Sequence, residues 1–309
     1  MNASLYQSLV PHTFDLLADS FAQLTRIDYF HHVGAFQKET ITILSIFGTV
    51  KFLKWAIVIS FFFHTYCLHR SKIHRYNHVS PDGSAAWALV TGACDARRRS
   101  NCAWEQKLLL QTELRELEME RKLDLEAIKN ELSKLNLTVL VNCANGEARH
   151  TDLKRILDEN EKPIWKHVNS DALYPIQLFR ALLPTLIGNS PSLIINVTSL
   201  SDKGFPLKIA TSASRSFLSR MTQSSALEMK LEGYDIEALC VRVSRRMGQT
   251  DSTLARAIIA RVGSRRSVVV GHWYQYLHKG LVDRLPGWLW DWCIIHYIRG
   301  KRDDISKGS

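Results

Sequence analysis

The sequence has few features of a chain held together by metal ions or disulfides. Its six cysteines are scattered along 309 residues and form no C-x-x-C pair, so we expect neither a zinc site nor a disulfide framework. Glycine occurs 15 times and proline 8 times, too rarely for a low-complexity chain, and no internal repeat is present. Hydrophobic residues make up 46% and charged residues 23% of the chain, which excludes global disorder and predicts one sizeable core.

Acidic residues are in the minority. The chain has 30 Asp and Glu against 40 Lys and Arg, a formal net charge of +10. A surplus of this size suits anionic partners such as phosphates, coenzyme A or lipid headgroups. Because the bases are dispersed and lie next to apolar runs, we expect no nucleic-acid partner.

One long segment contains no acid at all. It runs from Ile41 to Leu68 and is interrupted only by Lys51, Lys54 and His64. About 20 apolar residues cross a bilayer, so residues 41–68 are predicted to be a transmembrane anchor that follows an N-terminal region of residues 1–40. The lysines leave a monotopic hairpin or an interfacial helix as the alternative.

The bases that follow the apolar segment predict its orientation. Arg70, Lys72 and Arg75 lie in a basic linker of residues 69–84, and acids lie on the other side of the segment. The positive-inside rule then places the rest of the chain in the cytosol, as a single-pass protein. His74 and His78 also lie here, but no carboxylate lies between them, so we expect no metal site.

Residues 85–270 alternate between short apolar runs and amphipathic helical patterns. This alternation predicts an α/β fold with a doubly wound parallel sheet. A helix dense in charge is expected from about Glu105 to Leu135. The predicted strands are the apolar runs that end at Thr91 and at Asn142, together with residues 193–197, 236–243 and 267–270, and the further helices span residues 171–186 and 212–231.

Four short motifs occur in a recognisable order. Thr91-Gly92-Ala93 ends the first strand, Asn142-Cys143-Ala144-Asn145-Gly146 ends a later one, Asn196-Val197-Thr198-Ser199 ends the next, and Thr211-Ser212-Ala213-Ser214-Arg215 opens a helix. Over residues 85 to 300 this order resembles the short-chain dehydrogenase/reductase family. The anchor and the tail Leu285-Pro286-Gly287-Trp288 are similar to its branch of membrane-bound very-long-chain 3-oxoacyl-CoA reductases and 17β-hydroxysteroid dehydrogenases. The resemblance implies a Rossmann-like sheet and an endoplasmic reticulum membrane location.

The resemblance also implies four catalytic positions. Ser199 matches the serine that polarises the substrate carbonyl. Thr211 stands where the family has the tyrosine that donates a proton, and an aliphatic hydroxyl is far too weak an acid for that role. Arg215 stands at the lysine position, where it keeps a positive charge in a different shape. Asp171 falls where the family has a helix asparagine.

The cofactor implied by the resemblance is NADP(H). Its binding residues would be Thr91, Gly92 and Asp95 in the first turn, with Asn142 and Ala144 after the later strand. In that first turn Ala96 and Arg98 replace the second and third glycines of the family, which let the backbone approach the pyrophosphate. The interval from Gly92 to Asn142 is short for the two strands that the family places there, so the sheet is predicted to be truncated by one or two strands.

The C-terminal residues 271–309 are rich in tryptophan, tyrosine and bases. Amphipathic aromatic side chains beside Lys or Arg are typical of a membrane interface, so this segment is predicted to be membrane-associated, or else a lid over the substrate.

Two hypotheses of function follow. In the first, the protein is an oxidoreductase with impaired activity, whose ancestral reaction is NADP(H)-dependent reduction of a keto group on a lipid or acyl-CoA. In the second, it is a non-catalytic pseudoenzyme that binds a lipid or a partner enzyme at the membrane. A homo-oligomer is compatible with both.

Overall fold

The computed structural model describes residues 35–91, 114–117, 125–143, 155–201, 204–244 and 250–307. The chain divides into two units, residues 1–61 and residues 62–309, which are described separately.

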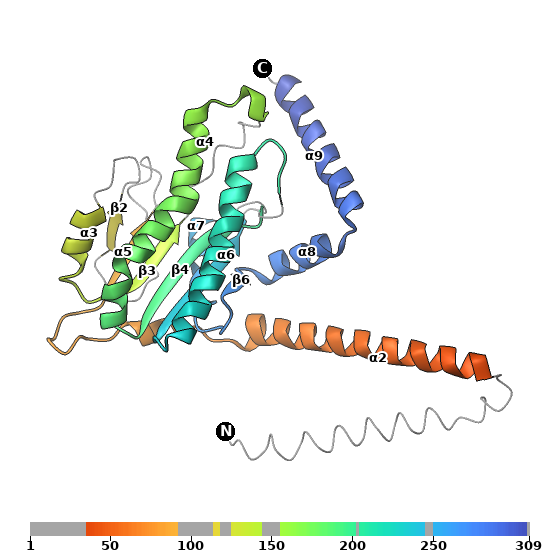
Figure 1. Cartoon of the computed structure of the whole chain (residues 1–309), viewed down its shortest axis with the longest axis horizontal. Helices are drawn as coiled ribbons and strands as arrows, with labels where there is room; N and C mark the ends of the chain where they lie inside the picture. Colours follow the sequence, from red (N-terminus) through yellow and green to blue (C-terminus); the bar gives the residue numbers. More distant parts are fainter. Residues whose placement is uncertain are drawn as a thin grey trace, which may run out of the picture. The chain divides into compact units, whose positions relative to one another are not determined.

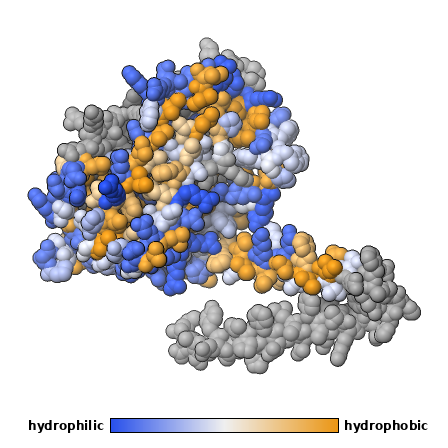
Figure 2. Space-filling model, in the orientation of Figure 1, coloured by the Kyte–Doolittle hydropathy of each residue, from blue (hydrophilic) through white to orange (hydrophobic). Residues whose placement is uncertain are grey.

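The described part of the first unit is a single apolar helix. Helix α2 spans Ala35–Phe63, and its side chains from Thr40 onward are exposed along nearly its whole length. Figure 2 shows apolar side chains along this helix. Its 29 residues, at about 1.5 Å each, extend over roughly 44 Å, more than the ~30 Å of a hydrocarbon core. By length and composition, residues 40–68 are long and apolar enough to cross a membrane.

The second unit is built on a six-stranded sheet in which every strand pair is parallel. The strand order is β2-β1-β3-β4-β5-β6, which confirms the predicted doubly wound α/β fold. Five of the strands fall on the apolar runs expected from the sequence. The bounds are β1 Trp87–Thr91, β2 Leu114–Leu117, β3 Leu137–Cys143, β4 Ser192–Ser199, β5 Ile236–Val243 and β6 Val268–Val270.

Helices cover both faces of this sheet (Figure 1). Side chains of α3, α5 and α6 pack on one face, and those of α7 pack on the other. Segment α4 continues through a π-helical turn, η5, directly into α5. The bounds are α3 Leu125–Leu132, α4 Glu161–Val168, η5 Asn169–Leu173, α5 Tyr174–Gly188, α6 Ile209–Leu231, α7 Asp251–Ile259, α8 Trp273–Arg284 and α9 Gly287–Lys307.

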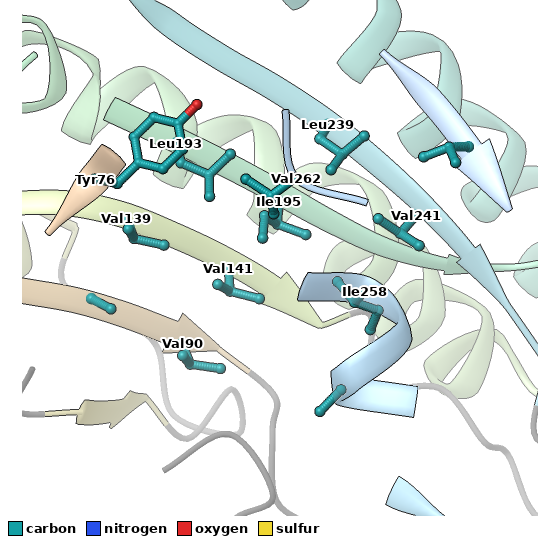
Figure 3. Packing of buried hydrophobic residues seen from close by; sticks show 13 residues of the cluster. Tyr76, Val90, Val139, Val141, Leu193, Ile195, Leu239, Val241, Ile258 and Val262 are labelled. Atoms are coloured by element: carbon teal, nitrogen blue, oxygen red, sulfur yellow. The ribbon is translucent and has the colours of Figure 1, made fainter. Parts of the chain in front are cut away.

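Alternate residues of each strand fill the two cores. Val139 and Val141 point to the face covered by α7, whereas Leu140 between them belongs to the other core, as the two-residue period of a strand requires. Figure 3 shows the first cluster, in which Ile258 and Tyr76 pack against the strands. Both faces of the strands are therefore apolar, which is why their sequences read as continuous hydrophobic runs.

The prediction of one long charged helix from Glu105 to Leu135 is wrong in the middle of that range. Residues 114–117 form β2, which pairs with β1 from Ala88↔Leu114 to Thr91↔Leu117, and among the described residues of this range a helix forms over α3. The leucine spacing of residues 114–117 fits a helix, but the free edge of β1 supplies a ladder of backbone hydrogen bonds that overrides this local preference. Among the described residues between β1 and β3, β2 is the one strand. The predicted truncation stays a prediction, because residues 92–113 and 118–124 lie outside the described residues.

Residues 64–79, most of them within the predicted basic linker, pack on the second unit; we call this segment the belt. It contains the short helices η2 (His64–Leu68) and η3 (Ile73–Tyr76). The backbone N–H of Lys72 donates to the carbonyl of Val262 (3.2 Å). The ring of Tyr76 is 1% exposed, while its hydroxyl donates to Glu237 Oε2 at 2.6 Å. The belt is therefore part of the folded unit.

Candidate functional site

The candidate site lies at the carboxyl ends of the central strands. Strand β1 has β2 on one side and β3 on the other, so the chain changes direction across the sheet between β1 and β3. Ligands of doubly wound folds bind in the crevice outside the strand ends at such a switch point. Thr91, Asn142 and Ser199 stand at or next to the last residues of β1, β3 and β4.

A buried row of polar side chains crosses these strand ends; we call it the polar ladder. The Thr91 hydroxyl donates to Asn142 Oδ1 (3.2 Å), and Asn142 Nδ2 donates to Asn196 Oδ1 (2.8 Å). Asn196 Nδ2 in turn donates to the hydroxyl of Thr222 on α6 (2.8 Å), which donates to the carbonyl of Leu218. The strand register places Thr91 beside Asn142 and Asn142 beside Asn196.

The polar ladder gives two predicted cofactor residues a structural role. Thr91 and Asn142 are each 1% exposed, and hydrogen bonds join their side chains to each other and to Asn196. Buried polar groups need such partners, since each unsatisfied group costs about 1–3 kcal/mol. The other predicted cofactor residues, Gly92, Asp95 and Ala144, lie outside the described residues.

Ser199 ends β4 in a half-buried position. Its hydroxyl donates to the Ser201 hydroxyl at 3.3 Å and accepts a hydrogen bond from the Ser201 backbone N–H at 3.3 Å. These bonds are long for hydroxyl contacts, so a substrate oxygen can replace the Ser201 hydroxyl as the acceptor.

Helix α6 carries the next two predicted residues. Thr211 is buried in its first turn, and Arg215 is half-buried one turn later. The helix contacts both β4 and η5, so it links the strand of Ser199 to the turn that holds Asp171.

Asp171 is the most buried charged residue of the site, with no exposed surface. Ser170 Oγ donates to its Oδ1 at 3.0 Å, and its Oδ2 is buried without a hydrogen-bond partner. Burial raises the pKa of Asp171 above its ordinary value, and the positive charge of Arg215 and the hydrogen bond from Ser170 oppose that rise. Arg215 is thus near enough for its charge to favour the carboxylate form of Asp171.

Sequence reasoning did not identify four residues that complete this arrangement. His167 and Ser170 flank Asp171, and the four-residue spacing from His167 to Asp171 on a helix would have revealed that pair. Asn196 and Thr222 complete the polar ladder. No local pattern indicates them, because their partnership depends on the register of β4 and the placement of α6.

The described residues include buried oxygens that can accept hydrogen bonds from a cofactor. Asp171 Oδ2 and Thr198 Oγ1 have no hydrogen-bond partner, which is the condition of groups that await a water or a ligand hydroxyl. The positive charge of Arg215 acts on Asp171. The glycine-poor turn with Ala96 and Arg98 lies outside the described residues.

Comparison with known proteins gives one family. The model described as short chain dehydrogenase matches residues 88–253. Hydroxysteroid dehydrogenase-like protein 1 of Gallus gallus is 23% identical over 190 residues, in an alignment that covers 56% of this chain and 56% of that protein. The chain therefore spans about half the length of that curated relative.

Solved structures of similar fold are more distant in sequence. A short chain dehydrogenase from Burkholderia cenocepacia J2315 in complex with NADP is 20% identical, with 64% of this chain and 93% of that chain covered and a TM-score of 0.49. Acetoin dehydrogenase from Enterobacter cloacae is 15% identical, with 62% and 96% covered and a TM-score of 0.49.

Proposed function

Because the chain belongs to the short chain dehydrogenase family, we propose that it is a membrane-anchored oxidoreductase whose ancestral reaction, NADP(H)-dependent reduction of a keto group, is impaired. The observation that carries this proposal is the composition of α6, which presents Thr211 and Arg215 where the resemblance implies tyrosine and lysine.

The missing step is proton donation. Ser199 can donate a hydrogen bond to a substrate carbonyl and polarise it. The developing alkoxide then needs a proton, and a threonine hydroxyl is a much weaker acid than a phenol with a pKa near 10. General acid catalysis contributes typically 10²–10⁴-fold in rate, so loss of the phenol alone removes on the order of that factor.

A bound nicotinamide cofactor would supply the hydride. The residues that would hold it are Arg215, which can hydrogen-bond a ribose hydroxyl, and the backbone at the end of β1. The charge of Arg215 also acts on the buried carboxylate of Asp171.

The composition of α6 also supports a second candidate function. With Thr211 where the resemblance implies tyrosine, the site has no phenol to act as a catalytic acid. The protein would then be a non-catalytic member that binds a lipid or a partner enzyme.

The proposed location is a membrane of the endoplasmic reticulum, with α2 as a single-pass anchor and the second unit in the cytosol. Support comes from the apolar length of residues 40–68 and from the bases that follow them. A lipid or long-chain acyl-CoA substrate fits this location, since its apolar part partitions into the bilayer beside the site.

The function is tested on the full chain in detergent with NADPH and a long-chain 3-oxoacyl-CoA. We expect no detectable NADPH oxidation, and we expect calorimetry to show NADPH affinity much weaker than micromolar. The variant Thr211→Tyr with Arg215→Lys should gain activity only if the cofactor binds, because a proton donor cannot act without a hydride donor.

Ser199→Ala is the control for both hypotheses. Native ketoreductase activity that disappears in Ser199→Ala would show that Ser199 works with another acid. The hypothesis that the activity is impaired would then be wrong. Micromolar NADPH binding without turnover would support the oxidoreductase ancestry and contradict loss of the cofactor site.

A further inference from the structure

Helices α8 and α9 expose a stripe of large apolar side chains; we call it the C-terminal stripe. On α8 its members are spaced by four residues, and on α9 by four and then three, so each set lies on one face of its helix. The six members are Trp273, Leu277 and Leu281 on α8, and Trp288, Trp292 and Ile295 on α9, all classed as exposed, with Leu281 at 69% and Trp288 at 73%.

The chemistry of the C-terminal stripe is that of a membrane interface. Three of its six members are tryptophan, which prefers the headgroup region because its ring is apolar and its N–H is polar. Lys301 lies over the ring of Tyr297, 5.7 Å from its centroid. Over residues 273–302 there are five bases, Lys279, Arg284, Arg299, Lys301 and Arg302, and two acids, Asp283 and Asp291.

Helix α8 packs on the residues that begin the second unit. The ring of Tyr276 lies 5.9 Å from that of Phe62 and 5.5 Å from that of Tyr66. The Tyr66 hydroxyl donates to the carbonyl of Val270 at 2.8 Å, and the guanidinium of Arg261 lies over the Tyr66 ring at 4.7 Å. Phe62 and Tyr66, which follow residues 1–61 along the chain, are therefore held against α8 within the second unit.

We infer that the C-terminal stripe is a second membrane contact, in which α8 and α9 lie on the surface of the bilayer next to the point where α2 leaves it. This inference rests on the proposed anchor. Its occupant is a bilayer surface with anionic headgroups, which the bases around the stripe attract while the tryptophans and leucines enter the interface.

Charge favours a bilayer over a second copy of the chain. A symmetric dimer through the C-terminal stripe would place the same surface on both sides, so two surfaces of net positive charge, each with five bases and two acids, would meet. Like charges across an interface disfavour association. An anionic lipid surface has the opposite charge.

The test measures the depth of spin labels on the full chain in vesicles of phosphatidylcholine with a minority of phosphatidylserine. Single cysteines are introduced after replacement of the native cysteines by serine, and circular dichroism checks the fold. Leu281→Cys reports on the C-terminal stripe. Leu231→Cys, at an exposed leucine that ends α6, is the matched control, and Ile57→Cys in α2 reports on the anchor.

We expect the label at residue 281 to collide with oxygen more, and with a water-soluble nickel chelate less, than the label at residue 231. The ratio of the oxygen collision rate to the nickel collision rate should be several-fold higher at residue 281. Leu277→Cys should behave like Leu281→Cys, which guards against a local effect of one substitution. Omission of phosphatidylserine should lower this ratio at residues 277 and 281.

Three results would overturn the inference, and they differ from one another. Equal ratios at residues 281 and 231, with the residue 57 label in lipid, would leave the anchor intact and place the C-terminal stripe in water. A residue 281 label shielded from both collision partners would show a protein contact, such as a second copy. A residue 57 label in water would refute the anchor itself.

Discussion

Replacing Asn142 by leucine tests whether the polar ladder stabilises the sheet. Leucine is close to asparagine in size but forms no hydrogen bond, so Asn142→Leu leaves the Thr91 hydroxyl and Asn196 Oδ1 buried without their partner. Each orphaned group costs about 1–3 kcal/mol. The free energy of unfolding should therefore fall by about 2–6 kcal/mol, and Tm on the order of 10 °C for a unit of this size.

Thermal unfolding of the detergent-solubilised full chain, followed by near-ultraviolet circular dichroism, measures this loss. Asn130→Leu is the matched control, because Asn130 is exposed on α3 and its replacement should change stability by less than about 0.5 kcal/mol.

A double-mutant cycle identifies the bond responsible. Thr91→Val removes the hydroxyl that Asn142→Leu would orphan, so the double variant should lose about 1–3 kcal/mol less than the sum of the single losses. Additive losses, or a cost of Asn142→Leu below about 1 kcal/mol, would refute the hydrogen bonding described for these strand ends.

Two further predictions concern Asp171 and Gly263. The pKa of Asp171 is raised by burial, so its contribution to stability is fully present below the unfolded pKa near 3.8 and is lost as pH rises through the folded pKa. Asp171→Asn should therefore raise Tm at neutral pH and flatten the decline of Tm with rising pH, whereas Asp158→Asn, at an exposed carboxylate with a lowered pKa, should do neither. A lower Tm for Asp171→Asn would contradict the raised pKa. Gly263 has φ +82°, and a Cβ there would lie 2.8 Å from Lys72 Cβ, whereas Gly233 has φ +73° and open space. In both alanine variants the free energy of unfolding should fall by about 1–2 kcal/mol because of the left-handed backbone. Only Gly263→Ala should also speed hydrogen exchange in the belt. Equal exchange in the two variants would show that the contact between Gly263 and Lys72 does not hold the belt in place.

Much of the fold could be predicted because each strand is buried on both faces. The apolar runs of residues 137–142 and 236–243 match β3 and β5 almost residue for residue. The pattern failed where a segment depends on a distant partner. Residues 114–117 have helical spacing yet pair with β1, and Tyr76 belongs to the sheet core although its neighbours are polar or basic.

The candidate site was predictable only through motif order. Position along the chain indicated Ser199, Thr211, Arg215 and Asp171, and the structure adds that Asp171 interacts with Arg215. The role of Asn142 could not be foreseen from its motif, since the hydrogen bonds of its side chain depend on the register of three strands. Such information is absent from any one segment.

The contacts of the belt determine when it can fold during synthesis of the chain. Its partners lie far ahead in the chain: Tyr76 meets Glu237 across 161 residues, and His69 meets Val262 across 193. At roughly 5–20 residues per second of synthesis, these partners leave the ribosome on the order of ten to forty seconds after the belt does. During that interval Tyr76 and Ile73 have only part of their core, because the cluster that holds them also needs Leu239, Ile258 and Val262. The earliest part of the second unit to be made is thus among the last to be completed, and a nascent chain cut short before β5 would leave the belt exposed to chaperones and proteases.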